Sequence, residues 1–191
     1  MKCSRNGQAR VLSPSELDRL IQCLPAGTHQ VLANLMRRTG SRVSEARQLT
    51  WGCITERAVL LPKGITKAKL ASREIPMHPD LWTVMQRWRS EWAAAMNRPP
   101  ESSDLVFPGR SPEWPISRQA FGQQLKVAAE KARLSGVATH SFRRSALSAA
   151  SAQGIPLAHL RSLSGHKSLA ALQRYLETTE EDKVKAAMAF A

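Results

Sequence analysis

One interval of this chain departs from helical hydrophobic period, and that departure restricts the fold more than any other feature of the sequence. Between Ile54 and Met77 the apolar residues form two short β-like runs, Arg57–Leu61 and Arg73–Met77, separated by a basic segment that contains Lys67. Two short runs with a turn between them are typical of an antiparallel hairpin. We therefore predict an α+β protein that is mainly α-helical, with one small antiparallel β-sheet and Lys67 on its turn.

Helix-capping residues mark where the helical segments begin. Ser13, Pro14 and Glu16 predict a first helix that starts with a capping box. A second helix is predicted over Thr28–Thr39, where Gly40 ends it. The other predicted helices begin near a capping residue or a proline at the head of an apolar run, namely Ser44, Pro79, Ser117, His140, Pro156 and Ser168.

The helix after Pro79 carries Leu81, Met85, Trp88 and Trp92 at helical spacing. That spacing predicts that the two tryptophans belong to the core rather than to a surface on which DNA bases stack.

The length of 191 residues, 42% of them apolar, suits one domain with a sizeable core. We expect a polar N-terminal arm over residues 1–12 and one domain over residues 13–191. No apolar run reaches membrane-spanning length, and the polar start lacks a secretory signal. Cys3, Cys23 and Cys53 lack the paired spacing of a zinc site or a disulfide framework. These features predict a soluble cytoplasmic protein with no membrane partner.

Basic residues outnumber acidic ones by 28 to 15, a formal net charge of +13. Such an excess favours a polyanionic partner, because basic side chains that bind phosphates release condensed counterions. Nucleic acid is the first candidate, and a solvated basic surface is the alternative.

The chain contains a single tyrosine, Tyr175. Roughly half a dozen would be ordinary at this length, so core packing has not recruited this residue type and the phenol stands out as a possible reagent. Upstream of it lie the cationic groups that could make a phenol nucleophilic toward phosphate, and they are Arg42, Lys67, His140, Arg143 and His166.

These residue types suit attack on a phosphodiester. Planar arginine forks match the non-bridging oxygens, on which charge develops, and they keep their own charge. Neighbouring cations favour the phenolate, a histidine can take its proton, and a lysine can protonate the leaving deoxyribose oxygen. The sequence has no Walker-type loop and no acidic cluster for two magnesium ions. We therefore expect no cofactor and no metal, and we expect His29, His78 and His159 to be structural or exposed.

Several short motifs occur in an order and spacing that resemble the tyrosine recombinase (phage integrase) family. They are Thr39-Gly40-Ser41-Arg42-Val43-Ser44-Glu45, a lysine-bearing hairpin that ends in Arg73-Glu74-Ile75-Pro76, His140-Ser141-Phe142-Arg143, Gly165-His166 and Tyr175. The resemblance covers the chain from about Val11 to Glu180. Ser141-Phe142 replaces a frequent Asp-Leu pair, and Ser164 replaces a frequent leucine.

The resemblance implies a tyrosine recombinase catalytic-domain fold over residues 13–191, without the N-terminal DNA-clamping domain that family members usually carry. It implies that Arg42 and Arg143 bind the scissile phosphate, that Lys67 and His140 manage protons and that His166 contacts the phosphate. Tyr175 would then attack to form a covalent 3′-phosphotyrosine. Glu45 matches a supporting acidic position of the family.

For the whole molecule, the resemblance implies site-specific recombination or integration of duplex DNA, as in mobile genetic elements. It also implies a nucleoid-associated location and self-association on DNA as a dimer or tetramer. Whether accessory DNA-bending proteins take part stays open.

Three alternatives also stay open. A type IB topoisomerase-like enzyme would use the same cleavage chemistry but let the strand swivel. A non-catalytic regulator would use residues 156–176 as a DNA-binding helix-turn-helix. Within the recombinase hypothesis, Lys69 competes with Lys67 for the role of general acid, since both fall on one face of the hairpin.

Overall fold

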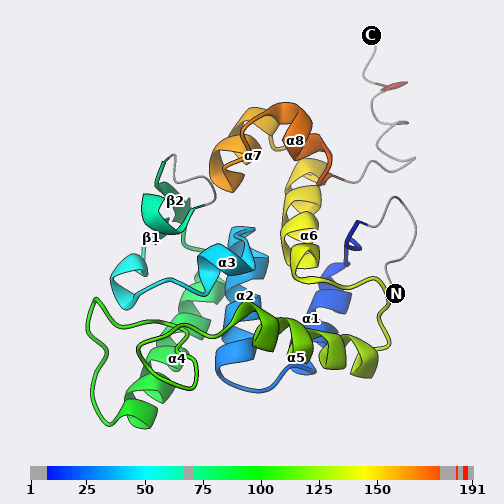
Figure 1. The fold of residues 1–191 in the computed structure, drawn as a ribbon. Coiled ribbons are helices and arrows are strands. Elements are labelled where there is room, and N and C mark those ends of the chain that lie inside the picture. Colours follow the sequence, from blue (N-terminus) through cyan, green and yellow to red (C-terminus); the bar gives the residue numbers. More distant parts are fainter. Residues whose placement is uncertain (1–7, 67–70, 177–183, 185–186, 189–191) are drawn as a thin grey trace.

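The computed structural model describes residues 8–66, 71–176, 184 and 187–188, and these form a mainly helical structure with one two-stranded sheet (Figure 1). The elements are, in chain order, α1 (Pro14–Gln22), α2 (Thr28–Thr39), α3 (Val43–Ala46), the 3-10 turn η1 (Trp51–Cys53), β1 (Ala58–Leu61), the 3-10 turn η2 (Lys63–Ile65), β2 (Arg73–Pro76), α4 (Pro79–Met96), α5 (Arg118–Lys131), α6 (Thr139–Ala152), α7 (Leu157–Ser164) and α8 (Leu169–Gln173). The predicted α+β class is confirmed.

Local signals in the sequence determine the first two helices. The Ser13 hydroxyl accepts the backbone N–H of Glu16, and the Glu16 carboxylate accepts the backbone N–H of Ser13, so the predicted capping box is present. Helix α2 ends at Gly40, whose φ of 61° lies in the left-handed region that glycine adopts most easily. This turn delivers Arg42 to the N-cap of α3.

The predicted hairpin is antiparallel, with Val59 opposite Ile75 and Leu61 opposite Arg73. Val59 and Ile75 are buried while Leu60 is exposed, as the two-residue period of a strand requires. The turn that was predicted to carry Lys67, and with it Lys69, lies outside the described residues.

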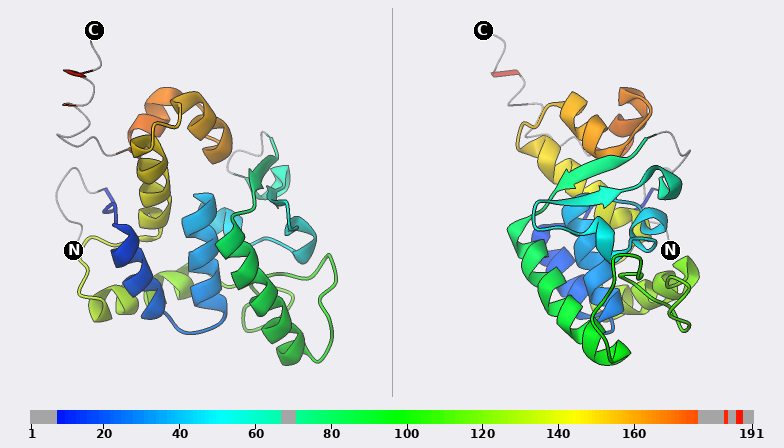
Figure 2. Two further views of the ribbon diagram at one scale, coloured as in Figure 1. Left: turned by 180° about the vertical axis from the view of Figure 1, so that it is seen from behind. Right: turned by 90° about the vertical axis from the view of Figure 1, so that its left-hand side faces the viewer.

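The main core surrounds α2, which packs against α1, α4 and α6 (Figures 1 and 2). Trp88 and Trp92 are buried in it, and their indole N–H groups donate to the backbone carbonyls of Val106 and Leu105 at 2.9 and 3.1 Å. The helical period therefore assigned both tryptophans correctly to the core.

A smaller, separate core joins α6, α7 and α8. Its buried residues are Leu147, Leu160 and Leu172, and Tyr175 and Leu176 pack against them. In Figure 1, α6 rises from the main body and α7 and α8 lie across its far end. The segment that carries Tyr175 is therefore held on α6 by apolar packing.

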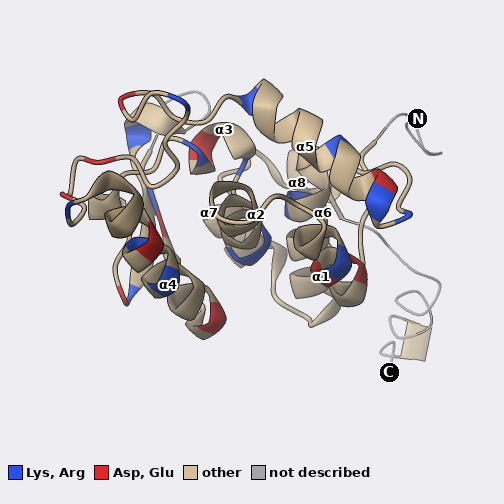
Figure 3. Ribbon diagram, turned by 90° about the horizontal axis from the view of Figure 1, so that it is seen from below, with Lys and Arg blue, Asp and Glu red and all other residues tan. Residues whose placement is uncertain are grey.

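Charges of both signs lie along α1 and α4 (Figure 3). By contrast, residues 131–176, which include α6, α7 and α8, contain no Asp or Glu. The part of the chain that carries His140, Arg143, His166 and Tyr175 is therefore free of acidic side chains.

Among the described residues, each helix is too short or too polar to cross a bilayer. Of the C-terminal segment, only Val184, Ala187 and Met188 are described, and each of them is helical.

Candidate active site

Arg143 lies inside the protein, in the first half of α6, and only 1% of its surface is exposed. Its Nη1 donates to the Gly40 carbonyl at 2.8 Å, and its Nη2 donates to the Ser164 carbonyl at 2.6 Å. The guanidinium thus joins the end of α2 to the end of α7. Arg143 is therefore part of the protein interior and not a surface charge.

The guanidinium of Arg143 retains donors for a further ligand. Its Nε is buried and has no hydrogen-bond partner among the described residues, and Nη1 carries a second hydrogen beside the one donated to Gly40. Burial, followed by the charge of Arg42, lowers the pKa of Arg143 to about 9, so that the side chain stays protonated at neutral pH. A buried cation with a vacant donor suits an incoming anion.

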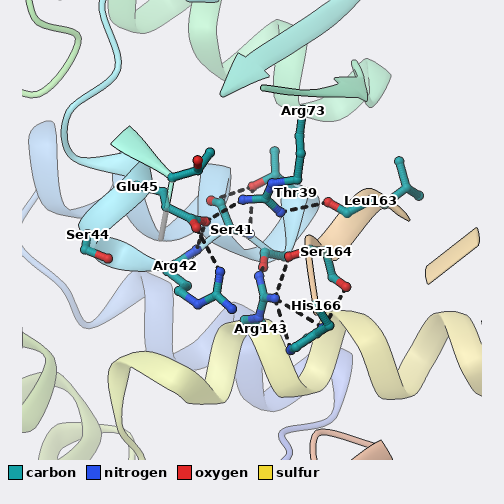
Figure 4. A network of polar contacts seen from close by, with 12 residues as sticks. Thr39, Ser41, Arg42, Ser44, Glu45, Arg73, Arg143, Leu163, Ser164 and His166 are labelled. Atoms are coloured by element: carbon teal, nitrogen blue, oxygen red, sulfur yellow. Dashed lines mark hydrogen bonds and ion pairs between the residues drawn. The ribbon is translucent and has the colours of Figure 1, made fainter. Parts of the chain in front are cut away.

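Arg42 is oriented by Glu45, a carboxylate that is itself 1% exposed (Figure 4). Arg42 Nη1 donates to Glu45 Oε1 at 2.8 Å, and the backbone N–H of Arg42 donates to Oε2 at 3.1 Å. Arg73 also donates to Oε2, at 2.7 Å. Burial raises the pKa of Glu45, but the Arg42 backbone hydrogen bond and the charges of Arg73 and Arg42 together bring it below its ordinary value. Glu45 is therefore ionised at neutral pH.

His166 follows the left-handed turn at Gly165 that ends α7, and it is buried. Its Nδ1 lies 2.7 Å from the Ser164 hydroxyl, a contact that fixes the orientation of the ring. Arg143 Nη2 lies 3.4 Å from Nδ1 and 3.2 Å from Nε2. Because these two nitrogens point in different directions, near-equal distances place the guanidinium against the face of the ring.

Burial, followed by the charges of Arg143, Arg42 and Arg73, lowers the pKa of His166 to about 3. The imidazole is therefore neutral at physiological pH in the protein without DNA. It can exchange hydrogen bonds with an anion but adds no charge to the site.

Tyr175 packs its ring against His166, with ring centroids 4.7 Å apart. The Arg143 guanidinium carbon lies 5.5 Å from the centre of the same ring. The backbone carbonyl of Tyr175 accepts from Arg144 Nε at 3.4 Å and from the Ser148 hydroxyl at 3.3 Å, and both of these residues are on α6. The ring of Tyr175, the one tyrosine of the chain, thus lies beside His166 and the buried Arg143.

His140 lies in the first turn of α6, about one helical turn before Arg143, and is exposed. Its ring centroid is 6.3 Å from that of Tyr175. The imidazole therefore lies beside the tyrosine ring.

Thr66 and Ala71, the described residues on either side of segment 67–70, form a base that lines the same site. Thr66 Oγ1 donates to the carbonyls of Lys63 and Ala71, at 3.0 and 3.2 Å, and so connects the two sides of the undescribed segment 67–70. A cavity of about 480 Å³ lies between this base, α3 and α7, and its lining includes Arg42, Thr66, Arg73, Arg161, His166 and Lys167. Lys67 itself lies outside the described residues.

Sequence reasoning missed two contributors to this geometry. Arg73 was seen only as part of the hairpin motif, and Ser164 only as a departure from a frequent leucine. The structure gives both a contact inside the site, with Glu45 and His166 respectively. Neither contact is visible in the sequence, because both depend on how distant segments fold together.

Of the predicted structural histidines, His29 stacks on Phe121, and His78 accepts the backbone N–H of Asp80 as the N-cap of α4.

A comparison with protein families matches residues 10–182 to the phage integrase family. Two curated relatives come from Sinorhizobium fredii (strain NBRC 101917 / NGR234), and both bear the name integrase/recombinase. One, y4qK, is 29% identical over 167 residues, which are 87% of this chain and 51% of the relative. The other, y4eF, is 28% identical over 167 residues, 87% of this chain and 63% of the relative. The chain thus spans about half to two thirds of the length of these relatives.

Solved structures share the fold at low sequence identity. The XerH site-specific recombinase bound to a palindromic difH substrate, in a post-cleavage complex, superposes with a TM-score of 0.78 at 18% identity, over 100% of this chain and 55% of that one. The XerA recombinase gives 0.74 at 17% identity, over 98% and 66%. The catalytic domain of bacteriophage HP1 integrase gives 0.61 at 16% identity, over 93% and 95%. The predicted catalytic-domain fold is therefore confirmed.

Proposed function

The chain belongs to the phage integrase family, and from this premise we propose that it is the catalytic domain of a site-specific DNA recombinase. Residues 13–191 would form this domain, after an arm over residues 1–12. It would cleave and rejoin duplex DNA through a 3′-phosphotyrosine. The observation that carries the proposal is the buried Arg143, with a vacant donor, in contact with His166 and beside Tyr175.

In the proposed reaction the Tyr175 oxygen attacks the scissile phosphorus, and the bond from phosphorus to the 5′ oxygen breaks. The phenol proton passes to His140, whose ring lies beside that of Tyr175. The leaving 5′ oxygen takes a proton from Lys67. The linkage is conserved as a phosphotyrosine ester, so that a 5′ hydroxyl of a second strand can reverse the step without an external energy source.

Arg42 and Arg143 are proposed to bind the non-bridging oxygens of the phosphate. Both are held in advance, Arg42 by Glu45 and Arg143 by two backbone carbonyls. Donors fixed before the reaction stabilise developing charge without a cost of reorientation. Nδ1 of His166 is engaged by Ser164, so we propose that Nε2 contacts the phosphate in exchange for its present contact with Arg143 Nη2.

Tyr175 belongs to the small core of its own α6, α7 and α8. This supports attack on the phosphate that is bound by the same subunit. Recombination exchanges strands between paired sites, so we propose that the protein acts as a dimer or tetramer on DNA, at the nucleoid. The DNA complexes of XerH and of the Tn1549 transposon integrase support duplex DNA as the partner.

The alternatives gain no support from the structure. A helix-turn-helix regulator would need a recognition helix in the segment after Pro156, but α8 spans only five residues. The topoisomerase alternative uses the same site, and relaxation of supercoiled plasmid by monomeric protein would favour it.

Covalent trapping tests the proposal. A library of nicked duplexes with randomised flanks serves as suicide substrate, because the short fragment beside the nick diffuses away after cleavage. We expect a covalent protein–DNA adduct on denaturing gels, with the DNA attached to the peptide that contains Tyr175 by mass spectrometry. The same library run with Tyr175→Phe should give no adduct. An adduct that persists in this variant would disprove the assignment of the nucleophile.

The general acid is tested with a 5′-bridging phosphorothiolate at the cleavage site, since a sulfur leaving group needs no protonation. We expect Lys67→Ala to be slow on normal DNA and to recover on the phosphorothiolate. Lys69→Ala is the matched control and should need no rescue. Rescue of Lys69→Ala alone would assign the role to Lys69.

A further inference from the structure

Arg73, which lies outside the predicted set, joins three parts of the candidate site. It is the first residue of β2, and its side chain is only 10% exposed. Nη2 donates to Glu45 Oε2 at 2.7 Å, and Nη1 donates to the Leu163 carbonyl at 2.9 Å (Figure 4). A single guanidinium therefore connects the hairpin to α3 on one side and to the end of α7 on the other.

The contact with Glu45 acts on Arg42. The carboxylate of Glu45 is shared, because Oε1 accepts from Arg42 Nη1 while Oε2 accepts from Arg73 and from the Arg42 backbone N–H. Glu45 is buried, so its rotamer depends on both cations. Without Arg73, the carboxylate keeps only the two hydrogen bonds from Arg42 itself, and no second cation aligns it for the Arg42 guanidinium.

The contact with Leu163 acts on His166. The last carbonyls of a helix have no partner within the helix, and Arg73 satisfies one of them at the end of α7. Gly165 packs so closely that a Cβ atom there would lie 2.8 Å from Arg73 Cδ and Nε. The backbone turn that presents His166 is thus built directly against the Arg73 side chain.

We propose that Arg73 is a positioning residue for strand cleavage, which holds Arg42 through Glu45 and holds the His166 turn through the Leu163 carbonyl. This inference depends on the proposed function. In this role Arg73 acts through Glu45 and the Leu163 carbonyl and makes no contact with the DNA phosphate, although it lines the same cavity as Arg42 and His166. The competing role for it, a further phosphate-binding arginine, gives a different result in the experiment below.

The test uses DNA recovered by the wild-type protein from the suicide library. Arg73→Ala and Arg73→Lys are compared with Arg87→Ala, which removes the same charge from an exposed arginine of α4. Dissociation constants are measured against salt concentration, and cleavage is measured in single turnover at saturating DNA.

We expect Arg73→Ala to slow cleavage about 100-fold, the scale of a misplacement of about 1 Å. The dissociation constant of Arg73→Ala for DNA should stay within about threefold of wild type, and its dependence on salt concentration should be unchanged. The control variant Arg87→Ala should cleave at the wild-type rate. A salt slope reduced by about one counterion would instead identify a phosphate contact and overturn the proposal.

Arg73→Lys keeps the positive charge, so it still tests the positioning role if Arg73→Ala simply unfolds the protein. An ammonium cannot serve both acceptors in a fixed fork, so we expect cleavage at least about 10-fold slower than wild type. Wild-type cleavage by this variant would refute the positioning role.

The path through Glu45 is tested by a double-mutant cycle with Glu45→Gln. If Arg73 acts through Glu45, the double variant should cleave about as slowly as the slower single variant, whereas losses that multiply would contradict the coupling. Absence of any adduct with the wild-type protein would reject the proposed function itself. Adduct formation with normal rates in the Arg73 variants would reject only the role of Arg73.

Discussion

Replacing Gly165 by alanine gives a direct measure of how tightly the His166 turn is packed. Gly165 has a φ of 65°, and an added Cβ would lie 2.8 Å from two atoms of Arg73 and 3.0 Å from its Cζ. Gly154, after the end of α6, has a φ of 81° but no neighbouring atom within 4 Å of an added Cβ. Both substitutions place an alanine in the left-handed region of the backbone and therefore share its energetic cost, but only Gly165→Ala displaces Arg73.

The expected magnitudes follow from this difference. Left-handed backbone costs a non-glycine residue roughly 1–2 kcal/mol, which is the whole expected effect of Gly154→Ala. At Gly165 the alanine must also push Arg73 away from Glu45 and the Leu163 carbonyl. Loss of hydrogen bonds that involve charged groups adds about 1.5–3 kcal/mol. We therefore expect Gly165→Ala to lower the free energy of unfolding by about 2.5–5 kcal/mol.

Urea unfolding followed by circular dichroism measures these free energies. In an Arg73→Ala background, Gly165→Ala should cost only the backbone penalty, as Gly154→Ala does, because the obstructing side chain is gone. Equal costs for the two glycine substitutions in the wild-type background would refute the packing argument. So would a cost of Gly165→Ala that does not depend on Arg73.

Three further predictions concern the site and the fold. Arg143→Lys should reduce single-turnover cleavage of trapped DNA by about 10²–10³-fold, since an ammonium cannot bind two carbonyls and a phosphate with one planar fork; near-normal cleavage would count against that role. The pKa of His166 is lowered from 6.5 to about 3, so between these values the unfolded chain binds the extra proton and stability falls as the pH drops. Denaturant titrations from pH 7 to pH 4 should show that wild type loses up to about 1.4 kcal/mol per pH unit more than His166→Gln, and parallel curves would exclude a neutral His166. Ser13→Ala should lower stability by about 1 kcal/mol through loss of the capping box, with unchanged cleavage; a thermal melt identical to that of wild type would show that the cap contributes nothing.

Local features were predictable because they depend on near neighbours in the chain. The capping box at Ser13, the stop of α2 at Gly40 and the apolar face that carries Trp88 and Trp92 each involve residues within a few turns of helix. The β-like runs predicted the hairpin for the same reason. Motif order was enough to select Arg42, His140, Arg143, His166 and Tyr175, which the fold gathers around one site.

The sequence alone, then, determined the helices and the hairpin, and it supplied the candidate catalytic residues. Only the tertiary structure decided that Arg143 is buried and that it donates to the carbonyl of Gly40, which lies 103 residues earlier in the chain. It likewise decided that Arg73 lies against Gly165. It also decided that His166 is neutral, because a pKa depends on burial and on charges that come from three separate segments. Capping and hydrophobic period are set by a few consecutive residues, whereas burial and charge proximity exist only after distant segments pack together.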